Sequence, residues 1–148
     1  MAEAMPVRAL TPGVARGPAL VLDEALSFWG GIDPGTGALI DTHHPQVGRM
    51  LAGVVLSMPS GRGSSSSSYV FAEAIRAGTA PVAVVLGEAD AIIALGAIVA
   101  AELYGIEVPV VVAPGAPLAT GDLVTVRSAD EGDASIVVDR GSRRDGRR

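Results

Sequence analysis

Five consecutive serines, residues 64–68, follow Gly61-Arg62-Gly63 and form the segment of this chain best suited to chemistry. The apolar segment 53–58 before them is typical of a buried strand, and the apolar residues of segment 69–77 after them recur at helical spacing. The first N–H groups of a helix have no partner inside the helix and lie at the positive end of its dipole. Glycines let these groups approach an anion closely, and the guanidinium of Arg62 adds positive charge. The pattern therefore predicts an anion site, where negative charge on a serine oxygen or on a substrate carboxylate is stabilised.

Glycine and serine in this proportion are also typical of a flexible linker. A linker would need an independently stable unit on each side, yet residues 1–58 and 69–139 would each be a small fragment with a weak core. A nucleotide-binding loop is disfavoured, because the segment lacks the third glycine of a dinucleotide fingerprint and the Gly-Lys-Ser or Gly-Lys-Thr ending of a P-loop. We therefore expect one domain that contains the serine run as a shaped loop.

The elements that would position this loop follow from the alternation of short apolar runs with turn residues. Asp90 can cap a helix over 91–104, and Gly105 can end it. We expect a break at Gly17-Pro18, a shaped loop over 28–37, and strands over 7–10, 19–22, 38–41, 53–58, 81–86, 108–113, 122–127 and 134–139. Two strand–helix–strand steps within this order predict a mixed α/β fold, a β/β/α layered domain with a mixed sheet.

Length and charge limit the possible functions. The 148 residues suit a single domain, and 49% of them are hydrophobic, so a core can form. Residues 140–148 contain five arginines, and we expect a disordered tail there beyond a domain at 1–139. In residues 1–139, six arginines face fifteen carboxylates, a net charge of −9. Such an acidic body argues against the binding of nucleic acid.

The chain has no cysteine, which excludes a disulfide, a thiolate metal ligand and a cysteine nucleophile within it. Residues 1–12 lack the basic start and apolar run of a signal peptide. The apolar stretch 89–104 is interrupted by Asp90, Gly96 and Glu102, so it is too short and too polar to span a bilayer. A cytoplasmic, soluble protein without membrane association is the expectation.

Histidine, aspartate and glycine in the loop regions are further candidates. His43 and His44 are adjacent, so on a strand they would point to opposite faces, and a metal ion shared between them is not expected. We expect one of them to contact substrate or to fix a loop. Gly30, Gly31 and Asp33 either line the edge of a site or form a tight turn in which Asp33 bonds its own backbone.

An aromatic pair and two carboxylates each allow two interpretations. Phe28 and Trp29 either anchor a partner subunit or pack in the core. Glu88 and Asp90 are expected to form a loop and a helix cap, with active-site work as the less favoured alternative.

Three segments, taken together and in this order, resemble the small swivel subunit of aconitase X enzymes over residues 7–139: Ser27-Phe28-Trp29-Gly30-Gly31-Ile32-Asp33-Pro34, Ile40-Asp41-x-His43-His44-Pro45 and Gly61-Arg62-Gly63-Ser64-Ser65. The third segment is also similar to the swivel domain of aconitase and isopropylmalate isomerase, which carries Gly-Ser-Ser-Arg-Glu at this loop. Here Ser66-Ser67 stand where those enzymes have Arg-Glu. That departure argues against recognition of a tricarboxylate such as citrate.

The resemblance implies a swivelling β/β/α layered domain with a mixed, partly barrel-like sheet, and a hydro-lyase made of two subunits. The large subunit would hold an iron–sulfur cluster or iron through its own cysteines, so that this chain binds no cofactor and no metal. By the same resemblance Ser64 is the catalytic base, acting as an alkoxide. The substrate-binding residues it implies, or that border this loop, are Ser65, Arg62, Gly63, Gly31, Asp33 and His43.

Two substrate classes are implied by the resemblance, mevalonate 5-phosphate and cis-3-hydroxy-L-proline. A phosphate-bearing substrate needs several cationic contacts, and Arg62, Arg49 and Arg76 are the arginines expected near the loop. The sequence does not decide between the two substrates.

Two other classes of function remain as alternatives. A mobile phosphocarrier domain needs an exposed histidine in a Gly-Gly-x-Thr-x-His-like loop, a setting that His43-His44 lacks. A stand-alone module would bind a small anion through the glycine/serine loop, without catalysis and without a partner chain. A swivel subunit, in contrast, should be inactive alone and should expose apolar surface until its partner covers it.

Overall fold

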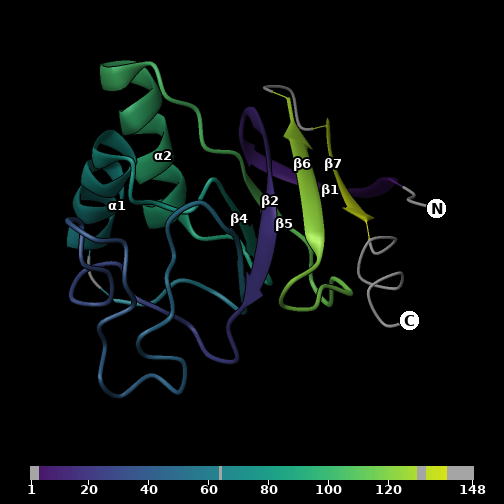
Figure 1. The fold of residues 1–148 in the computed structure, drawn as a ribbon. Helices are drawn as coiled ribbons and strands as arrows, with labels where there is room; N and C mark the ends of the chain where they lie inside the picture. The colour runs from purple at the N-terminus through teal and green to yellow at the C-terminus, as the bar shows by residue number, and fades with distance from the viewer. Residues whose placement is uncertain (1–3, 64, 130–132, 140–148) are drawn as a thin grey trace.

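The computed structural model describes residues 4–63, 65–129 and 133–139, and Figure 1 shows their arrangement. Ser64 and the expected tail, residues 140–148, lie outside the described residues. In chain order the elements are β1 (Ala4–Thr11), β2 (Gly13–Val21), β3 (Val55–Met58), α1 (Ser66–Ala77), β4 (Ala83–Leu86), α2 (Ala91–Tyr104), β5 (Val110–Val112), β6 (Leu123–Ser128) and β7 (Asp133–Asp139).

The strands close into a ring in the order β1-β5-β4-β3-β2-β6-β7, because β7 also pairs with β1. Strands β2, β3, β4 and β5 are parallel to their neighbours in this series, whereas the pairs that involve β1, β6 and β7 are antiparallel. Helices α1 and α2 connect the parallel strands and lie together on one side of the ring, opposite β6 and β7 (Figure 1). The mixed α/β fold with a mixed sheet predicted from the sequence is confirmed, and the ring is fully closed.

Two apolar cores follow from the alternation of side chains along the parallel strands. In β4, Ala83 and Val85 point into the ring, where they meet buried residues of β6 and β7 such as Val126. Val84 and Leu86 point to the other side and pack beneath the two helices. Both faces of β4 are buried, which is why this strand is apolar at every position. These are the layers of the predicted β/β/α domain.

The helix ends differ in how clearly the sequence marks them. Helix α2 begins after Asp90, whose Oδ1 accepts from the N–H groups of Ile92 and Ile93 at 2.8 and 3.0 Å, and it ends at Gly105 with φ of 69°. Both limits are those predicted. Helix α1 begins at Ser66, three residues before the predicted start, because the serines themselves form its first turn. Neither helix is both long and apolar enough to cross a bilayer within the described part of the chain.

Two local predictions were wrong. Residues 38–41 form no strand; Leu39 and Ala38 instead make isolated bridges to Ile32 and Met50. Gly17 and Pro18 do not break the chain but lie inside β2, whose first part pairs with β6. A side chain at position 17 would come within 2.7 Å of the Gly53 carbonyl oxygen, so glycine permits close contact between two segments there.

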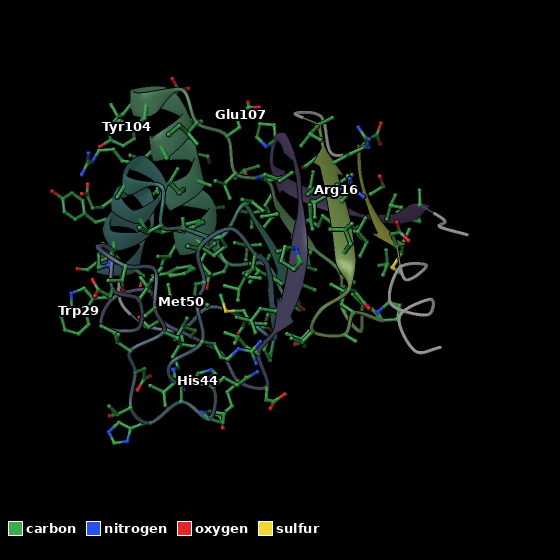
Figure 2. The ribbon with its side chains drawn as sticks, in the orientation of Figure 1. Arg16, Trp29, His44, Met50, Tyr104 and Glu107 are labelled. Carbon is green, nitrogen blue, oxygen red and sulfur yellow. The ribbon has the colours of Figure 1, made fainter. Side chains whose placement is uncertain are left out.

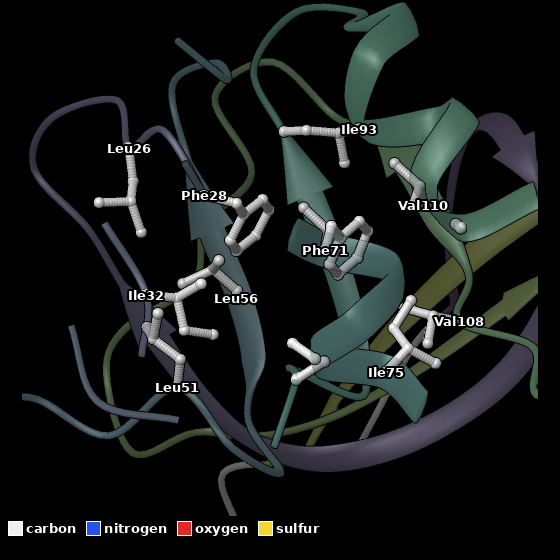
Figure 3. Packing of buried hydrophobic residues seen from close by; sticks show 14 of the residues in the cluster. Leu26, Phe28, Ile32, Leu51, Leu56, Phe71, Ile75, Ile93, Val108 and Val110 are labelled. Atoms are coloured by element: carbon white, nitrogen blue, oxygen red, sulfur yellow. The ribbon is translucent and has the colours of Figure 1, made fainter. Parts of the chain in front are cut away.

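The aromatic pair is divided between the core and the surface. Phe28 is fully buried and stacks on Phe71 of α1, with ring centroids 4.6 Å apart and planes 4° from parallel. Figure 3 shows the two rings side by side among apolar residues of the core between the sheet and the helices. Trp29 is 61% exposed. The stack therefore fixes the loop after β2 to the helix that follows the serine run.

The neighbouring aromatics provide a matched test of this packing. Phe28→Ala should lower the free energy of unfolding by about 3–5 kcal/mol, because it removes a buried ring and leaves a cavity against Phe71. Trp29→Ala should lower it by less than about 1 kcal/mol, because most of its ring is already in water. Urea denaturation followed by circular dichroism would measure both values. Equal losses for the two variants would contradict this assignment.

Candidate functional site

The serine loop lies where the carboxyl ends of three parallel strands meet. Met58 and Leu86 end β3 and β4 and are register partners, and the Leu22 N–H donates to the Ser57 carbonyl at 2.7 Å as the chain leaves β2. The chain then runs from β3 into α1 and from β4 into α2, so both helix N-termini face this edge. In sheets of this kind, ligands bind at the carboxyl ends of the strands. The predicted loop therefore has the location expected of a binding site.

The loop residues on either side of Ser64 are held in defined conformations. Gly63 has φ of 102°, and a Cβ there would overlap the Ser27 hydroxyl and lie 2.9 Å from the Ser27 Cβ. Glycine is therefore required at position 63 both by backbone conformation and by space. Ser65 is exposed at the N-cap of α1, and its carbonyl accepts from the N–H and the hydroxyl of Ser68 at 3.2 and 2.8 Å. The backbone on both sides of the predicted base is thus fixed.

Arg62 supplies positive charge beside this loop. Its Nη2 atom lies 3.6 Å from Oδ2 of Asp41, and its side chain is 53% exposed. The other carboxylate oxygen of Asp41 accepts from the His43 N–H at 2.9 Å. Asp41 therefore joins two of the predicted residues, Arg62 and His43, although the sequence analysis did not include it among the site residues. An ion pair this exposed is weak, so the guanidinium can exchange Asp41 for another anion at little cost.

Ser67 makes contacts that the sequence analysis missed. It is 3% exposed, and its Oγ lies 2.9 Å from Ser27 Oγ and accepts from the Trp29 N–H at 3.2 Å. The Ser27 hydroxyl donates to the Trp29 carbonyl at 3.1 Å, which leaves the Ser67 hydroxyl to donate to Ser27. We call this closed set of hydrogen bonds the serine clamp: Ser27, Ser67 and the backbone of Trp29. It joins the Phe28-Trp29 loop to the first turn of α1.

The predicted residues Gly31 and Asp33 lie in the turn that follows. Gly31 is buried, and a side chain there would overlap the Ser27 carbonyl oxygen. Asp33 Oδ1 accepts from the Gly35 N–H at 2.9 Å, the tight turn that was one of the two interpretations. The carbonyl oxygen of the next residue, Pro34, accepts from the hydroxyl of Thr79 at 2.7 Å. Thr79 lies just beyond the C-terminal end of α1. The structure therefore brings Gly31 near the clamp but places Asp33 toward the opposite end of α1.

The two histidines differ in environment and lie in the turn that follows residues 38–41. His43 is exposed, whereas His44, labelled in Figure 2, is 2% exposed. His44 Nδ1 accepts from the Gln46 N–H at 3.0 Å, and its Nε2 lies 3.2 Å from the Glu24 carbonyl, so Nε2 carries the proton. His44 is the histidine that fixes the loop. Among the described residues, no group of three or more His, Asp or Glu side chains could hold a metal ion.

Arg76 does not belong to the site. It lies in the last turn of α1, at the end of the helix away from the loop, and its Nε donates to Glu73 Oε1 at 2.9 Å. This hydrogen bond holds the pKa of the Glu73 carboxyl below its ordinary value. The expectation that Arg76 adds positive charge near the serines is therefore wrong. Arg62 does lie beside the loop, where it pairs with Asp41.

The carboxyl edge is open, and its hollow of about 180 Å³, lined by residues such as Leu22, Met58 and Leu86, is a depression of the surface. The hollow beside Arg62, Gly63 and Ser67 has a volume of about 10 Å³, which suits no more than a water molecule. A hollow of about 370 Å³ lies at the other edge of the sheet, between Val82 and Val108, with Arg16 and Glu107 at its margin (Figure 2). The arrangement at the serine loop can stabilise an anion, but another surface has to cover it before water is excluded.

Comparison with known proteins identifies relatives of this chain. Residues 4–136 match the family model for the aconitase X swivel domain. The chain is 38% identical to the phosphomevalonate dehydratase small subunit of Thermococcus gammatolerans over 132 residues, which cover 88% of this chain and 95% of the relative. It superposes on the crystal structure of Thermococcus kodakaraensis aconitase X in its holo-form with a TM-score of 0.78 and 36% identity, over 90% of this chain and 98% of the other.

A second kind of relative is much longer. The chain is 50% identical to the cis-3-hydroxy-L-proline dehydratase of Pseudomonas aeruginosa over 103 residues. These residues make up 70% of this chain but 18% of the relative. The chain thus spans less than a fifth of the hydroxyproline dehydratases that it matches.

A pair of glycine substitutions tests the contact between Gly63 and Ser27. Gly63→Ala and Gly30→Ala both place a side chain at positive φ, but Gly30 has no neighbouring atom within 4 Å of the added carbon. Gly30→Ala should cost about 1–2 kcal/mol of unfolding free energy through backbone strain alone. Gly63→Ala should cost at least about 1 kcal/mol more, because Ser27 must also move. Denaturant unfolding of the two variants would measure the difference, and equal costs would argue against the contact.

Proposed function

Because this chain belongs to the aconitase X swivel domain family, we propose that it is the small subunit of a two-subunit hydro-lyase that dehydrates a β-hydroxy acid. One observation carries the proposal: the glycine/serine loop opens α1 at the carboxyl edge of the sheet, with Arg62 beside it. The relatives that match over nearly their whole length are named as dehydratase small subunits, in agreement with this role.

Dehydration of such an acid requires a base for the poorly acidic proton on the carbon next to the carboxylate. We propose Ser64 as that base, acting as an alkoxide. It takes the proton, the electrons of the C–H bond form a carbon–carbon double bond, and the hydroxyl group leaves the neighbouring carbon as hydroxide, for which the iron centre would supply the Lewis acid. A free serine is far too weakly acidic for this role at neutral pH, so the N-terminus of α1, Arg62 and a water-free interface must stabilise the negative charge. Ser65 would bind substrate or support Ser64.

The iron centre implied by the family finds no ligand set among the residues that the structure describes. The sequence contains no cysteine, and the described residues offer no cluster of other ligands. We therefore propose that the iron–sulfur cluster or iron is held by the large subunit. The contribution of this chain is the base, the positive charge near it and part of the substrate site.

For the substrate we place cis-3-hydroxy-L-proline before mevalonate 5-phosphate. Binding of a phosphate by this chain would need several cations at the loop. Arg62 lies there, shared with Asp41, whereas Arg76 pairs with Glu73 at the far end of α1. Sequence identity does not separate the two substrates, because the chain is 50% identical both to a cis-3-hydroxy-L-proline dehydratase and to a phosphomevalonate dehydratase small subunit. The similarity to phosphomevalonate dehydratase small subunits keeps the phosphorylated substrate as the second candidate.

Affinity purification of this chain from its own cells tests the two-subunit proposal directly. We expect one stoichiometric partner of several hundred residues that contains cysteine, and a complex that dehydrates one of the two candidate substrates. Each subunit alone should be inactive. A chain that purifies alone and binds a small anion without catalysis would instead support a stand-alone binding module, and a phosphorylated histidine would support a phosphocarrier.

Substitution of the proposed base gives a sharper test in that complex. Ser64→Ala should lower kcat by at least about 10³-fold, because no other group in the loop replaces a positioned base. Subunit association should be unchanged, since the loss of one hydroxyl changes the area of an interface very little. Ser68→Ala is the matched control: the Ser68 N–H still donates to the Ser65 carbonyl after the hydroxyl is removed, so kcat should change by less than about 3-fold. Near-full activity of the Ser64 variant would show that Ser64 is not the catalytic base.

A further inference from the structure

We propose that Trp29 is the anchor by which this chain docks onto its large subunit, and that the serine clamp holds Trp29 ready for docking. The inference rests on the proposed function, because it requires that a large subunit exists. Trp29 would be the surface that contacts the large subunit, and the serine clamp would hold it in place.

The exposure of Trp29 contrasts with that of its neighbour. Trp29 is 61% exposed, and Figure 2 shows its ring at the outer margin of the molecule, pointing away from the body. Phe28, next to it, is fully buried in the stack with Phe71. Tryptophan is among the residues most enriched at the energetic centres of interfaces, since its large ring gains much from being covered. The chain has one tryptophan, and it stands in water beside the candidate site.

The serine clamp explains how this ring is presented. The Trp29 N–H donates to Ser67, and the Trp29 carbonyl accepts from Ser27, so both polar groups of its backbone are bound. Ser67 is itself buried on the rigid first turn of α1. A side chain whose backbone is already ordered loses less conformational freedom on binding than one on a mobile loop. The clamp therefore prepares Trp29 for a partner.

The same clamp touches the candidate site. Ser27 packs against Gly63, the residue before Ser64, so closely that a side chain at position 63 would overlap it. A partner that binds Trp29 thus presses on the segment that supports the serine loop. It also lies on the side from which the open edge has to be covered. Docking at Trp29 and closure of the site are in this way one event.

Two observations favour the large subunit over a second copy of this chain as the occupant. In the Pseudomonas aeruginosa relative the matched residues make up 18% of the protein, so an equivalent region is covalently joined to a much larger remainder. A large chain of this kind is a suitable partner for an edge that is open in this chain. Two copies of this chain would each carry a net charge of −5, and the resulting repulsion disfavours their association.

The experiment measures the dissociation constant between this chain and the co-purifying large subunit by titration calorimetry. Trp29→Ala should raise the dissociation constant at least 10-fold. Leu103→Ala is the matched control, because Leu103 is an equally exposed apolar residue, at 67%, in the last turn of α2, at the end away from the serine loop. It should change the dissociation constant less than 2-fold. Circular dichroism would confirm that both variants remain folded.

A double-mutant cycle tests the clamp. Ser67→Ala should weaken association several-fold in the wild-type background, because Trp29 is then less well ordered, but should cause no further weakening when combined with Trp29→Ala. Equal weakening in both backgrounds would overturn the presenting role of the clamp. Wild-type chain that binds no large subunit would overturn the proposed function and this inference together. Tight, active wild-type complex with unchanged binding of the Trp29 variant would overturn this inference alone.

Discussion

The stack of Phe28 on Phe71 is the contact on which the candidate site depends. Residues 22–54 join β2 to β3 without any helix or regular strand, and such a segment keeps one conformation only if its own side chains hold it to the core. Phe28 does this at 0% exposure, together with Leu26, Ile32, Leu39 and Leu51. Because Phe71 belongs to α1, the stack sets the position of the loop relative to the N-terminus of that helix.

Hydrogen bonds then refine what the apolar contacts have placed. Ser67 and Ser27 lie 2.9 Å apart across the junction of the loop and α1, and His44 closes the far part of the loop on the Glu24 carbonyl and the Gln46 N–H. A buried hydroxyl or imidazole without partners would cost free energy, so each pairing excludes other arrangements of the loop. The long segment is thus rigid where it borders the serine run. That rigidity is what an anion site built from backbone N–H groups requires.

Prediction from the sequence succeeded where the signal is local and failed where it depends on distant residues. Helix α2 was predicted at both ends because Asp90 and Gly105 act on their immediate neighbours. The start of α1 was missed because serines carry no apolar periodicity, although they form its first turn. Nothing near Ser67 in the chain indicates that its partner is Ser27, forty residues earlier. Likewise, Phe28 is buried and Trp29 exposed because Phe28 stacks on Phe71, and no pattern in the sequence connects Phe71 to this pair.

On the proposed function, the charge at the loop explains why a second chain would complete the site. Arg62 rests 3.6 Å from Asp41 in a half-exposed position, where water weakens the pair. Once another surface excludes that water, Arg62 interacts more strongly both with Asp41 and with any anion placed near the start of α1. While the edge is open, Arg62 stays solvated, and it can change its ion-pair partner at a small cost in free energy. On the proposed function, the negative charge of an ionised serine would be tolerated only in the closed state, which links proton abstraction to the assembled enzyme.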